Sequence, residues 1–282
     1  MNNYRPIKQK AKEIEAWLTR SSLKNLKTVF SPSFFQIVHG QIRSMEKRQA
    51  HGPINSMFIF LLDNSGGDSS QILLFEKYLG LIFSRLTTKK RNKIIGELRG
   101  DSSIDTFFEI GILANLLIQI PKGKIELFPK TVGKKNVDAR LEPVNRWLYL
   151  ECTVLHESDS DKERIEKMLI GKNITHYVGA INPQKGERRF QRKLLEKCNQ
   201  FAPSLPNVIL VSTFDSYPLP TTKNQAMQEI KLNNISAVLD FGREKFKKIY
   251  KDGCESVIQL TNEEKEILKT LFSTPKYKPL VY

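Results

Sequence analysis

The chain has 282 residues, a length that suits one large domain or two smaller ones with a substantial core. Its 45 lysines and arginines against 30 acids give a formal net charge of +15, which favours a polyanionic partner, nucleic acid first and an anionic membrane surface second. A lysine surplus that serves only solubility is the alternative. The three cysteines form no Cys-x-x-Cys pair and the four histidines no His-x-x-x-His pair, which argues against a structural zinc site.

The longest apolar run, near 107–120, is interrupted by Glu109 and is too short to span a bilayer. No segment resembles a signal peptide. We therefore expect a cytoplasmic protein that does not insert into a membrane.

The first hundred residues carry helical signals. Residues 1–50 are basic and place apolar side chains at roughly helical spacing, whereas "SMFIFLLD" (56–63) fits either a strand or a buried helix. "NSGGDSSQ" (64–71) is the best linker candidate, and Ser69 or Ser70 could cap a helix over 72–86. We expect a mainly helical region over 1–100, whose role stays open: a recognition module, a surface for homodimer formation, or a cover for a sheet edge.

The remaining residues, 101–282, alternate between helix and strand signals. The expected elements are a helix over about 105–120, strands over 124–131, 135–142 and 146–155, a charged helix over 161–171, a strand over 175–182, a basic helix over 187–201, a strand over 207–213, a helix near 222–233, a strand over 235–241 and a final helix over 262–273. This order predicts an α/β domain with a mixed central sheet flanked by helices on both faces.

The stretch "NVDARLEPVNRWLYLECTVL" (136–155) predicts two strands and a turn, with an acid inside each strand. A four-residue loop over 143–146 places Asp138 opposite Glu151, whereas a three-residue loop would send the two acids to opposite faces. The four-residue loop also gathers one apolar face, made of Val137, Ala139, Leu141, Leu148, Leu150, Cys152 and Val154. We therefore expect the two acids to lie close together.

Opposed like charges destabilise a hairpin, so a positive group should sit between Asp138 and Glu151. A hard divalent cation with oxygen ligands, Mg²⁺ or Mn²⁺, is the simplest candidate. A third acid, Glu109, is the one charge in an apolar helix and shares a stripe with Thr106 and Leu113, which favours an inward position. A surface glutamate is the alternative.

A helix with an inward acid followed by a hairpin with Asp and then Glu resembles the PD-(D/E)xK nuclease superfamily, which has the restriction-endonuclease-like fold. The matching residues are Glu109 in "FFEIGILANLL", Asp138 in "NVDARLE" and Glu151 in "WLYLECTVL". The resemblance continues through "RRFQRKLLEKCNQFAPSLPNVILVSTFD" and covers about 101–260. It implies an α-β-β-β-α-β core and Mg²⁺-dependent cleavage of nucleic acid, DNA more than RNA. The implied metal ligands are Asp138, Glu151 and the Cys152 carbonyl, with Glu109 as a ligand directly or through water.

Two positions depart from the pattern of this superfamily. Val137 stands where the motif has proline, and Thr153 stands where it has the lysine that stabilises developing phosphate charge. A threonine hydroxyl cannot supply a cation. The superfamily includes members whose lysine has migrated to another element. The resemblance therefore implies that a basic residue on another helix or strand supplies the missing positive charge.

The basic helix offers such a residue. Arg189, Lys193 and Lys197 recur every four residues with Gln200 on the same stripe. Lys197 could replace the lost amine and Gln200 could hold water or phosphate. A solvated basic face, or a ridge that only positions phosphates, is the alternative.

Further basic residues are expected to contact nucleic acid. Lys130, Lys134 and Lys135 would bind phosphates without recognising sequence, and Arg140 and Tyr149 would flank the scissile strand. Arg189 and Lys193 would bind the backbone beside the acids. The rival function is a nuclease-fold protein that lost catalysis with its lysine and binds nucleic acid or a protein partner.

Overall fold

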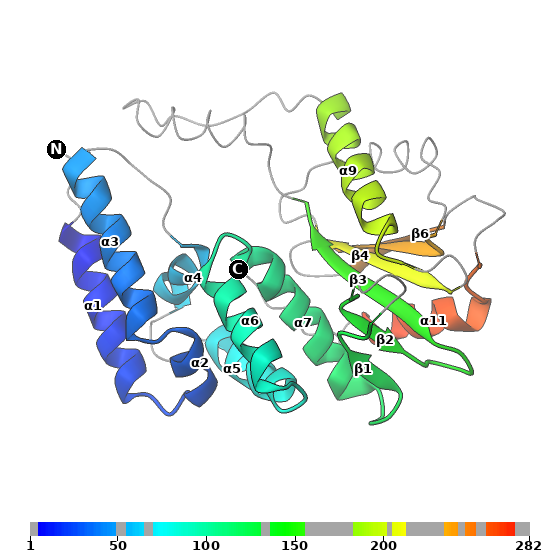
Figure 1. Cartoon of the computed structure of the whole chain (residues 1–282), viewed down its shortest axis with the longest axis horizontal. Helices are drawn as coiled ribbons and strands as arrows, with labels where there is room; N and C mark the ends of the chain where they lie inside the picture. Colours follow the sequence, from blue (N-terminus) through cyan, green and yellow to red (C-terminus); the bar gives the residue numbers. More distant parts are fainter. Residues whose placement is uncertain are drawn as a thin grey trace. The chain divides into compact units, whose positions relative to one another are not determined.

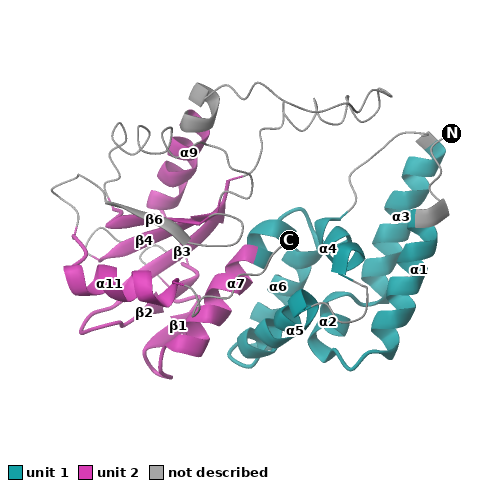
Figure 2. Cartoon of the chain, turned by 180° about the vertical axis from the view of Figure 1, so that it is seen from behind, with its two compact units in different colours: residues 1–107, 157–179, 282 teal, residues 108–156, 180–281 magenta. Residues whose placement is uncertain are grey.

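The computed structural model describes residues 5–48, 55–64, 70–130, 136–155, 183–201, 205–212, 234–241, 246–251 and 258–273 (Figure 1). The described part divides into two compact units, one within 1–107 and the other within 108–156 and 180–281 (Figure 2). The elements expected over 161–171, 175–182 and 222–233 lie outside the described residues, as does Ser69. None of the described helices combines the length and apolarity that crossing a bilayer requires.

The first unit is helical, as predicted for the N-terminal region. The ambiguous run over 56–63 is a helix, and the ring centroid of its Phe60 lies 5.7 Å from that of Phe75 and 5.0 Å from that of Phe107. The helices of this unit are α1 (Arg5–Arg20), α2 (Lys24–Val29), α3 (Pro32–Arg48), α4 (Ser56–Asn64), α5 (Ser70–Phe83) and α6 (Thr88–Arg99), followed by the start of α7 (Ser103–Gln119).

Side chains from other helices satisfy both ends of the short helix α2. The Glu76 carboxylate accepts hydrogen bonds from the backbone N–H groups of Asn25 (3.1 Å) and Leu26 (2.8 Å). At the other end, Arg99 Nε donates to the Val29 carbonyl at 2.6 Å. Helix ends leave backbone groups without intrahelical partners, so these two charged side chains stabilise a helix too short to persist alone.

The second unit is built on a six-stranded mixed sheet with the strands in chain order, which confirms the predicted mixed sheet. The first three strands are antiparallel, the third to fifth are parallel, and the last pair is antiparallel again. They are β1 (Ile125–Leu127), β2 (Ala139–Leu141), β3 (Leu148–Val154), β4 (Asn207–Ser212), β5 (Ala237–Phe241) and β6 (Phe246–Lys251).

Helices cover both faces of this sheet (Figure 1). On one face, α9 (Pro183–Cys198) buries Phe190 and Leu194 against Tyr149, Ile209 and Val238. On the other face, Phe241 of β5 packs against Phe108 of α7 and against Phe272, which follows α11 (Asn262–Leu271). β3 therefore lies between two apolar layers, and all of its residues are buried.

Several predicted boundaries needed correction. The strands expected over 124–131 and 135–142 are short, because Phe128 has a φ of 53° and the chain leaves the extended conformation there. A single bridge, Lys130 with Asn136, links the two segments beyond that point. β6 was not predicted, since its lysine-rich sequence lacks an apolar run and charged residues are common in edge strands.

Candidate active site

The hairpin of β2 and β3 has the register that the four-residue loop predicts. Its pairs are Ala139 with Leu150, Arg140 with Tyr149, and Leu141 with Leu148. The loop prediction is therefore confirmed along the whole of β2, and the segment carrying Asp138 enters β2 directly beside the middle of β3.

Asp138 lies where the two strands separate. Its backbone N–H donates to the Leu150 carbonyl at 3.1 Å, and its own carbonyl accepts from Phe128 N–H at 2.9 Å. Its carboxylate Oδ2 accepts from the Cys152 N–H at 2.6 Å, a short charge-assisted bond. The side chain thus takes the place of a backbone carbonyl in the hydrogen bonding between β2 and β3. It is held at Cys152, the residue that follows Glu151.

One detail of the predicted hairpin is wrong. Val137 was expected on the face of Leu150 and Cys152, but it packs with Tyr149 and Phe190 on the α9 side. The strict alternation of side chains holds only within the extended strand, and β2 begins at Ala139. The position of Asp138 is therefore set by its hydrogen bonds and not by alternation.

Glu151 lies in the middle of β3 and its side chain is only 4% exposed. Lys197 Nζ, from the last turn of α9, donates to Glu151 Oε1 in an ion pair. The Gln200 amide, with its nitrogen turned toward the acid, donates to Oε1 at 2.8 Å and to Oε2 at 3.2 Å. The structure thus brings both residues proposed from the basic stripe onto the acid.

Burial dominates the electrostatics of this pair. It raises the pKa of the Glu151 carboxyl, and the charge and hydrogen bond of Lys197 offset the rise only in part, with a smaller contribution from Lys193. Burial alone would lower the pKa of Lys197, but the Glu151 carboxylate outweighs it, so that the pKa of Lys197 is raised. Each partner therefore favours the charged form of the other, and burial opposes the charged form of both.

The oxygen atoms that could ligate a metal at this site suit a hard divalent cation. Leu150 and Cys152 both direct backbone groups toward Asp138, so the Cys152 carbonyl lies on the same edge of β3 as the Asp138 carboxylate. Among the described residues, no group of three or more His, Cys, Asp or Glu side chains is gathered as a ligand set. Two carboxylates and a carbonyl still fit Mg²⁺, which is commonly held by one or two carboxylates and keeps several waters.

Glu109 of α7 acts on this region through its charge. Burial raises the pKa of the Cys152 thiol, and the negative charges of Asp138, Glu109 and Glu151 raise it further. Glu109 is therefore near enough to influence the residue that follows Glu151 on β3. Both roles suggested for it, direct ligand and ligand through water, stay predictions.

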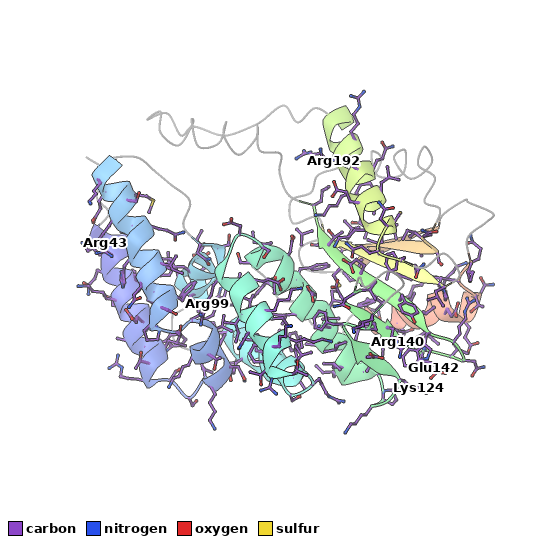
Figure 3. All side chains as sticks on the ribbon, in the orientation of Figure 1. Arg43, Arg99, Lys124, Arg140, Glu142 and Arg192 are labelled. Carbon is purple, nitrogen blue, oxygen red and sulfur yellow. The ribbon has the colours of Figure 1, made fainter. Side chains whose placement is uncertain are left out.

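Arg140 is held by its neighbours on the hairpin. It forms an ion pair with Glu126 at 2.6 Å, its guanidinium lies 4.5 Å from the Trp147 ring centroid, and it donates to the Tyr149 hydroxyl at 3.4 Å. Figure 3 shows it beside Lys124 and Glu142, where Glu142 N–H donates to the Lys124 carbonyl. Arg140 and Tyr149 thus lie side by side, as their predicted role requires.

The other predicted phosphate contacts vary in position. Lys130 is exposed three residues beyond the end of β1, and Arg189 and Lys193 lie partly buried along α9. Lys134 and Lys135 lie outside the described residues. Lys193 is near enough to Glu151 for its charge to lower the pKa of that carboxyl.

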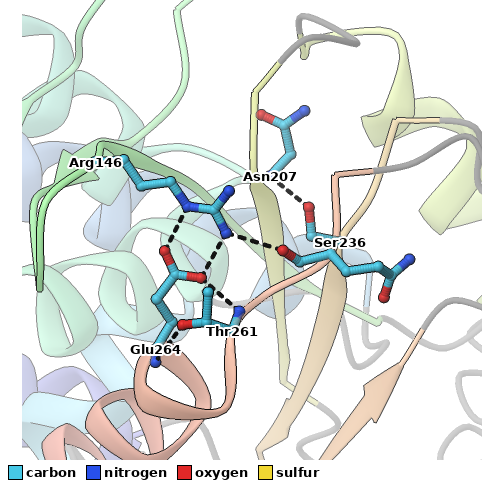
Figure 4. Close-up of polar contacts among 6 residues, drawn as sticks. Arg146, Asn207, Ser236, Thr261 and Glu264 are labelled. Carbon is cyan, nitrogen blue, oxygen red and sulfur yellow. Dashed lines mark hydrogen bonds and ion pairs between the residues drawn. The ribbon is translucent and has the colours of Figure 1, made fainter.

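Sequence reasoning missed the contact that holds the hairpin loop. Arg146 donates from Nε and Nη2 to the two carboxylate oxygens of Glu264, at 2.6 and 2.7 Å, and to the Gln259 carbonyl at 2.9 Å (Figure 4). Glu264 also closes a capping box with Thr261 at the start of α11. The T-x-x-E pattern was visible in the sequence, but the arginine 118 residues away was not deducible from it.

A second missed contact fixes the strands that follow α9. Asn207 N–H, at the start of β4, donates to the Ser236 hydroxyl at 3.1 Å (Figure 4), and Ser236 N–H donates to the Asn207 carbonyl at 2.7 Å. These bonds hold the entrances of β4 and β5 together beneath the end of α9.

Comparison of the chain with family models, with curated proteins and with solved structures gave no match.

Proposed function

We propose that the protein is a metal-dependent nuclease that hydrolyses phosphodiester bonds of nucleic acid. The observation that carries this proposal is the meeting of Asp138, Glu151, Lys197 and Gln200 from three separate segments of one unit. A cation, an amide and two carboxylates at the point where two strands separate match the chemistry that phosphodiester cleavage needs.

Each residue has a distinct role in this proposal. Asp138, Glu151 and the Cys152 carbonyl would hold Mg²⁺, which lowers the pKa of water and neutralises phosphate charge when bound. Lys197 supplies the positive charge that Thr153 cannot, and the Gln200 amide fixes the Glu151 carboxylate and donates to a water or phosphate. Burial makes the charge of Glu151 effective, because water is largely excluded from its carboxylate.

The substrate follows from charge and from the resemblance. The net charge of +15 favours a polyanion, and Lys130, Arg189 and Lys193 add cations beyond the end of β1 and along α9. We expect DNA more than RNA, because the resembling superfamily cleaves mainly DNA. Lys130 and Lys193 would bind phosphates without distinguishing sequences.

Cleavage of plasmid DNA, linear duplex DNA and single-stranded RNA tests the proposal. The wild-type protein should cleave at least one of them with Mg²⁺ or Mn²⁺ and stop when EDTA is added. Glu151→Gln should lower the rate constant by at least about a thousandfold, because the variant removes a ligand charge and keeps the shape. The matched control is Glu266→Gln on α11, whose side chain is 69% exposed; it should keep wild-type activity.

A second function has its own support. Lys197 already neutralises Glu151 without a metal ion, which suits a site that no longer catalyses and only binds nucleic acid. Affinity for DNA should then fall steeply with salt, because bound cations release counterions from phosphates. Tight, EDTA-insensitive binding with no cleavage of any substrate would establish this function and contradict the first.

A further inference from the structure

Both oxygens of the Glu151 carboxylate accept hydrogen bonds from the protein. Lys197 and the Gln200 amide donate to Oε1, and the same amide reaches Oε2. Asp138 Oδ2 is likewise engaged, by the Cys152 N–H. The acid pair of the resting protein is therefore already supplied with donors, including one full positive charge.

A divalent cation at this pair would meet that charge at close range. Lys197 Nζ bonds to Oε1 of the carboxylate that would ligate the metal, and its side chain is only 19% exposed. Water therefore screens little of the repulsion between an ammonium and a metal ion that share one carboxylate. The two cations therefore compete for the Glu151 carboxylate.

We propose that Lys197 is an internal occupant of the metal site, and that loading of the metal releases its ammonium from Glu151. This inference rests on the proposed function and adds an order of events to it. The resting protein keeps the buried acid compensated by its own lysine. The metal takes over Glu151, and the freed ammonium becomes available to a phosphate oxygen of the substrate.

The position of Lys197 on α9 makes this exchange feasible. It lies in the last turn of the helix, and Gln200 follows the helix end, so a rotation of one long side chain suffices and α9 need not move. Leu194 and Phe190, which anchor α9 on the sheet, are fully buried and hold the helix in place. Gln200 can keep its bond to Glu151 while the lysine leaves.

Titration of the protein with Mn²⁺, without nucleic acid, tests the exchange. The electron paramagnetic resonance signal of free Mn²⁺ gives the affinity of each variant for the metal. Lys197→Met should bind Mn²⁺ at least about tenfold more tightly than wild type, because a competing charge is gone. Lys193→Met removes a charge one turn earlier on the same helix and should change the affinity by no more than about threefold. Asp138→Asn removes a proposed metal ligand and should abolish Mn²⁺ binding.

A measurement on the wild-type protein avoids dependence on the folding of a variant. An amine-acetylating reagent followed by mass spectrometry reports how accessible each lysine is. Lys197 should be protected in metal-free protein and should react several-fold faster with saturating Mg²⁺ or Mn²⁺. Lys193 should react equally in both conditions.

The outcomes separate this inference from the proposed function. Equal Mn²⁺ affinity in wild type and Lys197→Met, with unchanged Lys197 acetylation, overturns the exchange but leaves a metal-dependent nuclease intact. Failure of both proteins to bind Mn²⁺ overturns the proposed metal site itself. Tighter binding by Lys197→Met together with metal-induced acetylation of Lys197 supports the exchange.

Discussion

Two glutamates of the sheet unit are nearly buried and paired with a cation from another element, yet their acidities move in opposite directions. The side chains of Glu264 and Glu151 are 2% and 4% exposed. For Glu264, burial raises the pKa but the hydrogen bonds from Arg146 and Thr261 outweigh it, so the pKa is lowered. For Glu151, burial outweighs Lys197 and the pKa is raised.

The opposite pKa shifts come from the hydrogen-bond donors that surround each carboxylate. Arg146 grips both oxygens of Glu264 with a planar fork, and the capping box adds a backbone N–H. Glu151 has a single ammonium and one side-chain amide in place of the fork, and the Asp138 backbone adds a smaller contribution. A carboxylate with a full set of rigid hydrogen-bond donors has a structural role. A buried carboxylate whose negative charge is incompletely compensated is a candidate for a catalytic role.

The largest effect on stability should come from breaking the ion pair between Arg146 and Glu264. Arg146→Met leaves Glu264 buried with Thr261 to stabilise its charge but no cation, so the free energy of unfolding at neutral pH should fall by about 3 kcal/mol. Urea unfolding measures this. The matched control, Arg192→Met, removes an arginine whose side chain is 76% exposed and should change stability by less than about 0.5 kcal/mol. A similar loss in both variants would contradict the comparison.

Much of this unit was predictable because its signals are local. α7, β3, α9, β4, β5 and α11 each lie within a few residues of the ranges expected from apolar periodicity. The stripe that carries Lys197 and Gln200 follows from helix geometry alone, and the hairpin register follows from loop length. These features depend on residues close together in the chain.

The remaining features depend on distant partners. Nothing near Asp138 shows that its carboxylate will replace a ladder carbonyl at Cys152, because that requires β2 to start one residue later. The Arg146–Glu264 pair joins the hairpin loop to α11 across most of the unit. The pKa of Glu151 likewise depends on the layers that bury β3 and not on its own neighbours in sequence.

The second effect is a pair of pH dependences with opposite sign. The lowered pKa of Glu264 contributes stability above its unfolded pKa, near 4.3, and this contribution is lost as the pH falls through the folded pKa. The raised pKa of Glu151 does the reverse, since stability is lost as the pH rises from the unfolded to the folded pKa. A folded pKa that differs from the unfolded pKa by one pH unit changes the free energy of unfolding by about 1.4 kcal/mol.

Unfolding free energies from pH 3 to pH 8 measure both dependences. Relative to wild type, Glu264→Gln should lose stability as the pH rises through the acid range, and Glu151→Gln should gain it. In the Glu151→Gln variant, Lys197 lies beside a neutral amide, which adds a constant offset and does not alter the slope. Slopes of the same sign in the two variants would show that the two glutamates do not differ in the way described.

The smallest effect concerns where the catalytic cation comes from. Thr153 lies two residues after Glu151 on the same face of β3, about 7 Å along the strand, and is only 4% exposed. In the Lys197→Met background, Thr153→Lys would return an ammonium to Glu151 from the strand. Because burying the new side chain has its own cost, we expect recovery of only a few-fold in the rate constant, about 1 kcal/mol.

Thr153→Met in the same background is the matched control, because it adds similar bulk without charge. It should recover nothing. If the lysine variant cleaves no faster than the methionine variant, then a cation beside Glu151 is not what the site lost, and Lys197 matters for holding α9 and not for the reaction. Recovery by lysine alone would mean that the charge matters more than the element that carries it, because strand and helix approach Glu151 from the same side of the sheet.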